Sequence, residues 1–354
     1  MCRRKYQMPL FWFGSLMLLI LIWASCTADD VSQSQQDYLI NVDIYLPNAN
    51  GDSAYVADPH VIKVEDTWYL YGTYGVYLEA WSSKDLFTWK HEGIIWQPTL
   101  GSWNDEGNIW APHVEVAPDG YYLYYSANGR IGLAFSTSPV GPFEEIYDHP
   151  FIGGGYGRVG NGIYISDDYD VNDPLDFLID LEEYAIDAFV LKANDGSLTF
   201  YCSVLNPFSV IAAVPMIDYQ TLDTLRPKIV LDSKVLSWEV ATREGVWIIE
   251  NEGTFHLMYS GNQWWSPDYS VGVARGQSPM GPFRRRADNP ILHKDATLGL
   301  SGPGHHSVVE GKYNDRLIFF HNRRDLSDGS FIRSVRYMPI EFSANSELEI
   351  IYPD

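Results

Sequence analysis

A strand–turn–strand pattern that recurs five times is the feature that most limits what this chain can fold into. In each copy an apolar stretch leads into a turn with Asp, Asn or Gly, and a second stretch rich in aromatic residues follows. This order of residues is the pattern of a β-hairpin. The five copies span residues 60–74, 113–127, 189–203, 247–261 and 307–322.

A repeated tail indicates that these hairpins belong to one repeating architecture. The second and fourth hairpins are followed by "AFSTSPVGPFEEI" (134–146) and "VARGQSPMGPFRRR" (273–286), and a related segment follows the first. Further strands behind each hairpin would give five four-stranded sheets, and the radial repetition of such sheets is a β-propeller. A β-sandwich could hold as many strands, but it gives no reason for the SP-x-GPF tail to recur. We therefore predict an all-β, five-bladed β-propeller over residues 46–354.

The first 26 residues have the layout of an export signal. Three basic residues (3–5) precede an apolar run (9–23), and two small residues precede Cys26. This arrangement is similar to the bacterial lipoprotein signal, in which the cysteine becomes the lipidated first residue. An uncleaved anchor and an ordinary cleaved signal are the alternatives. Residues 27–45 are polar and predict a tether. We expect secretion across the inner membrane and attachment to the cell envelope or surface only through a lipid on Cys26.

Composition excludes several classes of function. The net charge of −22 repels phosphate backbones, so nucleic acid is a poor candidate partner. Three cysteines are too few for a disulfide framework, and Cys202, in a strand-like stretch, is expected in the core. No CxxC or HExxH pattern supports a zinc site. The acidic surface suits a protein that handles neutral or cationic ligands.

Each hairpin has a polar or aromatic residue at or just before its first strand, in otherwise apolar surroundings. These residues are Asp58, Trp110, Asp187, Glu244 and His305. The innermost strand of every propeller blade lines the central axis, so the five side chains are expected to converge on one pocket. Burying an unpaired charge is costly, and three carboxylates converging from three blades therefore indicate function.

The motifs around these residues resemble those of the family 43 glycoside hydrolases. The segments "ADPHVI", "WAPHV", "IDAFV", "EGTFHLMYSG" and "GPGHHSVV" follow the order of that family over about residues 50–352. The family consists of five-bladed propellers that cleave arabinose- and xylose-containing polysaccharides. The resemblance implies that Asp58 is the general base and Glu244 the general acid. It also implies that Asp187 orients the acid and raises its pKa.

The resemblance suggests roles for two further residues. His305 would lie in the central channel near a water or a metal ion such as calcium, and no other cofactor is required. Arg333 would reach a substrate hydroxyl, although Arg336 competes for this role.

Aromatic side chains are candidates for the sugar platform, since the C–H faces of sugars pack well on flat rings. The candidates are Trp81, Trp110 and Trp264 with its neighbour Trp265. Twelve tryptophans in a β-rich chain also serve as core between blades, so each candidate has that alternative.

The expected activity is inverting hydrolysis of arabinosyl or xylosyl linkages in plant cell-wall polysaccharides, as by an α-L-arabinofuranosidase or β-xylosidase. An inverting enzyme needs a carboxylic acid and a carboxylate about 6.5 to 9.5 Å apart, with room for water. The enzyme alternatives are an endo-acting arabinanase, a galactan-cleaving relative, and a retaining fructan-cleaving propeller. The last needs an Arg-Asp-Pro that "AIDAF" does not supply. A non-catalytic carbohydrate-binding propeller would have no reason to keep all three acids.

Overall fold

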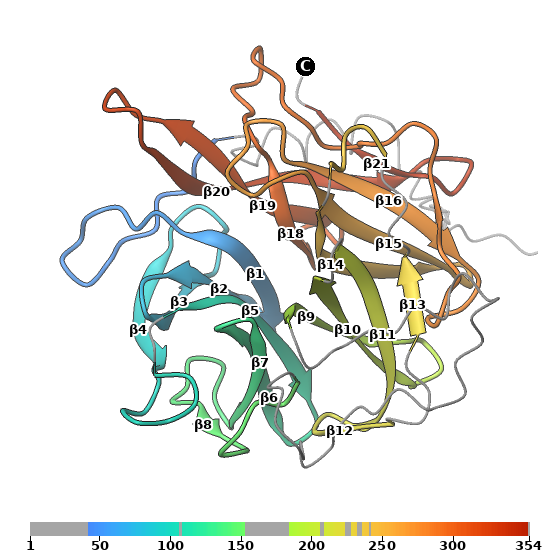
Figure 1. Ribbon diagram of the computed structural model, residues 1–354. Helices are drawn as coiled ribbons and strands as arrows, with labels where there is room; N and C mark the ends of the chain where they lie inside the picture. The colour runs from blue at the N-terminus through green and yellow to red at the C-terminus, as the bar shows by residue number, and fades with distance from the viewer. Residues whose placement is uncertain are drawn as a thin grey trace, which may run out of the picture. The chain divides into compact units, whose positions relative to one another are not determined.

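The computed structural model describes residues 42–105, 108–152, 184–205, 209–223, 228–231, 236–240 and 242–352. All five predicted hairpins form, and each supplies the first two strands of an antiparallel sheet (Figure 1). Four sheets have four strands in chain order, and the third has five, because β12 and β13 both pair with β11.

The strands are grouped by blade as follows. Blade 1 holds β1 (Ala57–Val64), β2 (Thr67–Tyr74), β3 (Tyr77–Ser83) and β4 (Lys90–Trp96). Blade 2 holds β5 (Ile109–Ala117), β6 (Gly120–Ala127), β7 (Arg130–Ser136) and β8 (Glu144–Glu145). Blade 3 holds β9 (Ala185–Lys192), β10 (Leu198–Leu205), β11 (Ser209–Asp218), β12 (Thr221–Leu222) and β13 (Lys228–Leu231). Blade 4 holds β14 (Arg243–Asn251), β15 (Thr254–Gly261), β16 (Ser270–Gly276) and β17 (Arg284–Arg285). Blade 5 holds β18 (Gly304–Glu310), β19 (Arg316–Asp325), β20 (Phe331–Phe342) and β21 (Leu348–Ile350).

The first strands of the five blades close into a ring. In order around the ring, β1 contacts β5, β5 contacts β9, β9 contacts β14, β14 contacts β18, and β18 contacts β1 again. This closure confirms the predicted five-bladed β-propeller. Blades 1 and 4, which carry Asp58 and Glu244, are not neighbours in the ring.

The hydrophobic core lies between neighbouring blades. Five buried clusters each combine side chains from two adjacent blades. In one of them, Trp68 and Trp81 of blade 1 pack with Phe319 and Tyr337 of blade 5. The aromatic alternation of the hairpins therefore serves mainly to fill these interfaces. Cys202 is fully buried in β10, as expected for a core residue.

The N-terminal predictions fall largely outside the described residues. The expected signal (1–26) and most of the expected tether (27–45) are among the residues not described. At the first described positions the chain already contacts blade 5, because the N–H of Ile44 donates to Val335 O at 2.9 Å. Within the described ranges no helix is long and apolar enough to cross a membrane.

Candidate active site

The first strand of every blade has the same irregularity near its start. Its pairing with the second strand shifts register there, which marks a β-bulge. One residue at each bulge has a positive φ, between 44° and 58°: Asp58, Ala111, Asp187, Gly245 and His305. This conformation is uncommon for residues other than glycine, and such strain often accompanies function. The fold thus creates five equivalent special positions around its axis.

Four of the bulges are held by the preceding blade. A side chain near the end of that blade's second strand accepts the N–H of the bulge residue. The pairs are Thr73 with Ala111 (2.9 Å), Ser126 with Asp187 (3.0 Å), Ser260 with His305 (2.8 Å) and His321 with Asp58 (3.4 Å). These bonds fix the backbone that presents Asp58 and Asp187, so the position of these two acids depends on contact between blades.

The five residues singled out in the sequence line one cavity, but they are not equivalent in register. Asp58, Asp187 and His305 occupy the bulge position, whereas Trp110 and Glu244 lie one residue before it. Aligning the hairpins by sequence alone missed this offset of one residue. All five line an open cavity of about 840 Å³. The structure therefore confirms that these five side chains converge on one pocket.

Asp58 lies in surroundings that keep its carboxyl ionised. Its Oδ2 accepts a hydrogen bond from Thr73 Oγ1 at 2.6 Å, and its Oδ1 accepts one from Arg333 Nη1 at 3.1 Å. The Nδ1 atoms of His321 and His305 lie 3.2 and 3.6 Å from Oδ1. Burial by itself raises the pKa of Asp58, but Arg333 and the two imidazoles together hold it well below its usual value. This carboxylate can accept a proton from water.

Glu244 lies in surroundings that favour its protonated form. The side chain is 8% exposed, and its Oε1 accepts a hydrogen bond from Tyr269 Oη at 2.7 Å. Burial raises the pKa of Glu244 to about 7, with a further rise from the charge of Asp58. The Tyr269 hydrogen bond and the charge of Arg333 oppose this rise. Glu244 can therefore hold a donatable proton near neutral pH.

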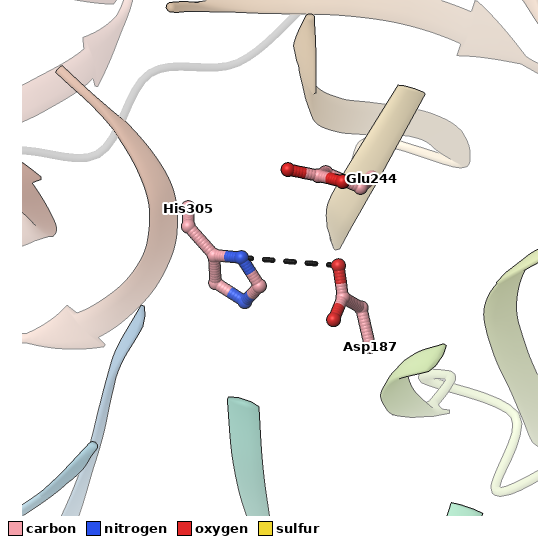
Figure 2. Close-up of side chains that lie close together, drawn as sticks. All are labelled: Asp187, Glu244 and His305. Carbon is pink, nitrogen blue, oxygen red and sulfur yellow. Dashed lines mark ion pairs between the residues drawn. The ribbon is translucent and has the colours of Figure 1, made fainter. Parts of the chain in front are cut away.

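Asp187, Glu244 and His305 surround one small space, and one ligand atom of each lies within 4.8 Å of those of the other two (Figure 2). Asp187 Oδ2 accepts the N–H of Gly245, the residue after Glu244, at 3.2 Å and lies 3.8 Å from His305 Nδ1. Among the described residues its Oδ1 has no hydrogen-bond partner. Burial and the charges of Glu244 and Asp58 hold the pKa of Asp187 well above its usual value. The bond to Gly245 is suited to orienting the residue that precedes it.

Asp187 and Glu244 act on one another's protonation. The sequence led us to expect that Asp187 raises the pKa of Glu244. Burial is the largest cause of the raised pKa of both carboxyls, and the proximity of two like charges opposes the ionisation of both together.

The predicted sugar-platform residues separate into two groups. Trp110, Trp264 and Trp265 line the cavity, and the last two are 43% and 48% exposed. Trp81 is fully buried in the core between blades 5 and 1, and its Nε1 donates to Pro47 O at 2.7 Å. Assigning Trp81 to sugar binding was therefore wrong, because its ring has no face open to the cavity.

The choice between two arginines is decided by position. Arg333 lines the cavity, contacts Asp58 and stacks over Trp264, with its guanidinium carbon 4.8 Å from the ring centroid. Arg336 instead pairs with Asp43 at 2.7 Å. Arg333 is thus the arginine that a ligand in the cavity would meet.

Three residues of the site were not predicted. Thr73 and His321 contact Asp58, and Tyr269 contacts Glu244. A polar residue does recur near the end of the second stretch of the hairpins, and this signal could have led to Thr73 and His321. Tyr269 precedes β16, outside the hairpin pattern, so the sequence offered no comparable signal.

Comparison with known proteins identifies the family. The description "Glycosyl hydrolases family 43" matches residues 53–168 and 155–347, which together cover most of the chain. This chain belongs to glycosyl hydrolase family 43. It is therefore an O-glycosyl hydrolase, as the resemblance in the sequence indicated.

Relatives of this family 43 chain act on different glycans. A β-D-galactofuranosidase from Aspergillus niger is 26% identical over 291 residues, which cover 75% of this chain and 74% of the relative. An extracellular endo-α-(1→5)-L-arabinanase from Thermotoga petrophila is 26% identical over 326 residues, covering 76% and 65%. The crystal structure of an endo-1,4-β-xylanase from Bacteroides thetaiotaomicron superimposes with a TM-score of 0.71 and 27% identity, covering 85% and 95%. The family and the fold are shared, while the named substrates differ.

The donor atoms around His305 can be compared with the ligands that the expected calcium ion would need. Asp187, Glu244 and His305 each offer one atom, and these atoms lie within 4.8 Å of one another. Calcium takes six to eight oxygen ligands, whereas this set has one nitrogen and two carboxylates. Direct binding of calcium by these three side chains therefore fits poorly. It would also occupy both Asp187 and Glu244, so we derive no step of the reaction through a metal.

Proposed function

We propose that this family 43 enzyme hydrolyses arabinosyl or xylosyl linkages in plant cell-wall polysaccharides with inversion, as an α-L-arabinofuranosidase or β-xylosidase. The observation that carries the proposal is that one cavity holds two buried carboxyls with different partners, Arg333 beside Asp58 and Tyr269 beside Glu244. The pKa of Asp58 is held well below its usual value, and that of Glu244 is raised to about 7. A base and an acid are thus available together near neutral pH.

The proposed reaction assigns one proton transfer to each of these residues. Asp58 accepts a proton from a water molecule as the water oxygen bonds to the anomeric carbon of the sugar. At the same time the bond from that carbon to the glycosidic oxygen breaks, and Glu244 donates its proton to the departing oxygen. Asp58 and Glu244 come from non-adjacent blades, an arrangement that supports a gap wide enough for the water.

Three other residues support this chemistry without exchanging protons. Asp187 accepts the N–H of Gly245 and so orients the backbone next to Glu244. Arg333 holds Asp58 and is placed to meet a sugar hydroxyl, and the ring of Trp264 offers an exposed face for sugar C–H groups.

The identity of the sugar is the part of the proposal that most needs a direct test. Purified enzyme would be assayed with 4-nitrophenyl α-L-arabinofuranoside, β-D-xylopyranoside and β-D-galactofuranoside, with linear arabinan alongside. We expect the arabinofuranoside or the xyloside to be cleaved fastest. Faster release of oligosaccharides from linear arabinan would support an endo-acting arabinanase instead. Failure to hydrolyse any glycoside, with binding retained, would support a carbohydrate-binding propeller.

Variants test the assigned roles. Asp58→Asn, Asp187→Asn and Glu244→Gln should each lower kcat by about a hundredfold or more, as expected for loss of a general acid or base or its support. Glu115→Gln is a matched control, because burial also raises the pKa of Glu115, to about 8, yet this residue does not line the cavity. Near-normal activity in a folded variant would remove that residue from the mechanism.

A further inference from the structure

Tyr269 is fixed rigidly beside the proposed general acid. It is fully buried at the end of the loop that precedes β16, and its Oη lies 2.7 Å from Glu244 Oε1. Its ring stacks on that of His321, with centroids 5.5 Å apart and planes at 8°. Gly304 leaves room for it, since a Cβ there would lie 2.3 Å from the Tyr269 ring. Packing on both sides therefore holds the hydroxyl in one place.

The hydrogen bond between Tyr269 and Glu244 has a defined direction. The Tyr269 hydroxyl donates to Glu244 Oε1 at 2.7 Å. An ionised carboxylate can only accept hydrogen bonds, so this direction persists after Glu244 has given up its proton. The backbone beside the Tyr269 ring is also held, because the N–H of His305, the residue after Gly304, donates to Ser260 Oγ at 2.8 Å.

We propose that Tyr269 is a positioning residue for Glu244, fixing which carboxyl oxygen carries the proton and donating to the carboxylate once the proton has left. Because Oε1 accepts from Tyr269, the transferable proton resides on Oε2. When Glu244 protonates the leaving oxygen, the hydrogen bond from Tyr269 becomes charge-assisted and strengthens. An interaction that is stronger in the transition state than in the ground state accelerates the reaction. This inference rests on the proposed role of Glu244 as general acid.

The dependence of rate on the leaving group tests the proposal. Aryl glycosides of the preferred sugar would be compared, from 2,4-dinitrophenyl, which departs without protonation, to phenyl, which needs it. We expect Tyr269→Phe to lower kcat/KM on the phenyl glycoside by about ten- to a hundredfold, the loss of a hydrogen bond to a charged group. The rate on the dinitrophenyl glycoside should change by less than about threefold, because no proton transfer assists it.

Tyr259→Phe is the matched control. Tyr259 is also fully buried in blade 4, and its hydroxyl donates to a buried glutamate, Glu239, at 2.6 Å. Neither Tyr259 nor Glu239 lines the cavity. Tyr259→Phe therefore removes a similar bond and should leave the ratio of the phenyl to the dinitrophenyl rate as it is in the wild type.

The outcomes separate the inference from the function on which it rests. Equal losses on all leaving groups, or no loss on any, in Tyr269→Phe would overturn the role of Tyr269. Glu244→Gln, assayed with the same aryl glycosides, tests whether Glu244 is the acid. If the rate of this variant does not depend on the leaving group, the proposed function is overturned. If Tyr269→Phe unfolds, 3-fluorotyrosine at position 269 keeps the ring and makes the hydroxyl a stronger donor. It should then make the rate less dependent on the leaving group, and an unchanged dependence would reject the proposal.

Discussion

Two carboxyls in the same cavity differ in protonation because their immediate partners differ. Both Asp58 and Glu244 are buried, and burial alone raises the pKa of each. Asp58 has Arg333 at 3.1 Å, the largest of the effects that lower its pKa, and His305 and His321 add to that effect. Among the hydrogen bonds described, Glu244 accepts only one from a side chain, that of the Tyr269 hydroxyl. The positive charge in contact with Asp58 is therefore the main difference between the base and the acid.

These two pKa values predict the pH dependence of kcat/KM. Glu244 must be protonated to act, so activity should fall as pH rises through about 7, where the acid loses its proton. Asp58 must be ionised, and its pKa lies well below its usual value, so activity should persist down to about pH 4. Initial rates between pH 4 and pH 9 check this. Activity that increases from pH 6 to pH 8 would contradict the assignment of Glu244 as the acid.

Replacing Arg333 should shift the acidic side of that profile. Arg333→Met removes the positive charge beside Asp58, so the pKa of Asp58 should rise and the base should be protonated at low pH. We expect the variant to lose more activity at pH 4–5 than at pH 7. Arg336→Met is the control, because Arg336 pairs with Asp43 instead. An equal loss at every pH would assign Arg333 to substrate binding alone.

The sequence could identify the three acids but not their partners. A carboxylate at the start of an apolar strand can be recognised in the sequence alone. Three such carboxylates at matching places in three hairpins predicted that their side chains meet in one pocket. The contact of Asp58 with His321 joins residues 263 positions apart and depends on how blades 5 and 1 meet. Trp81 failed as a prediction because a core tryptophan and a sugar-binding tryptophan look alike in an alternating strand.

At the scale of elements, the repeated SP-x-GPF tail proves to be a connection between blades. Tyr71 of blade 1 donates to Pro139 O at 2.6 Å, and Tyr201 of blade 3 donates to Pro279 O, also at 2.6 Å. Phe143 and Phe283 of the two tails are buried in the cores that each blade shares with the one before it. The sequence showed that the tail is repeated. It did not show that the tail joins blades, because that depends on which tyrosine the tail contacts.

Blade 4 contains a buried charge cluster whose loss should destabilise the fold. Glu239 is fully buried and contacts Arg243 at 3.1 Å, Arg285 at 2.8 Å and Tyr259 at 2.6 Å. Glu239→Gln would leave buried positive charge less well compensated. We expect the free energy of unfolding to fall by about 3 to 5 kcal/mol, as measured in denaturant.

An exposed ion pair provides the comparison for that measurement. Lys84 and Asp66 are 3.0 Å apart, and both side chains are largely exposed. Asp66→Asn should therefore change the free energy of unfolding by no more than about 1 kcal/mol. Similar values for the two variants would mean that the Glu239 cluster adds little to stability.

At the scale of the whole molecule, closure of the propeller was predictable because the hairpin repeats. Each hairpin must bury its aromatic residues against a neighbour, and five equivalent units can do so by closing a ring.

The N-terminal segment contains no such repeat, so its role can be predicted only from its resemblance to an export signal. We propose that the mature protein begins at a lipidated Cys26 and is held at the bacterial cell envelope. Mass spectrometry of the processed N-terminus should find a lipid on Cys26, and Cys26→Ala should release the protein from membranes. An unmodified start would reject the proposal.

The configuration of the released sugar tests how the whole ring presents its acids. Asp58 and Glu244 stand on blades that are not neighbours, so a water can act between the base and the sugar. A base that activates water gives the inverted anomer, whereas a carboxylate nucleophile lies about 5 to 5.5 Å from the acid and gives retention. We expect proton NMR of the fresh product, recorded before mutarotation, to detect the inverted anomer first. If the retained anomer appears first, inversion is rejected. Asp58 would then act as a nucleophile that bonds to the sugar, and Glu244 would act first as acid and then as base.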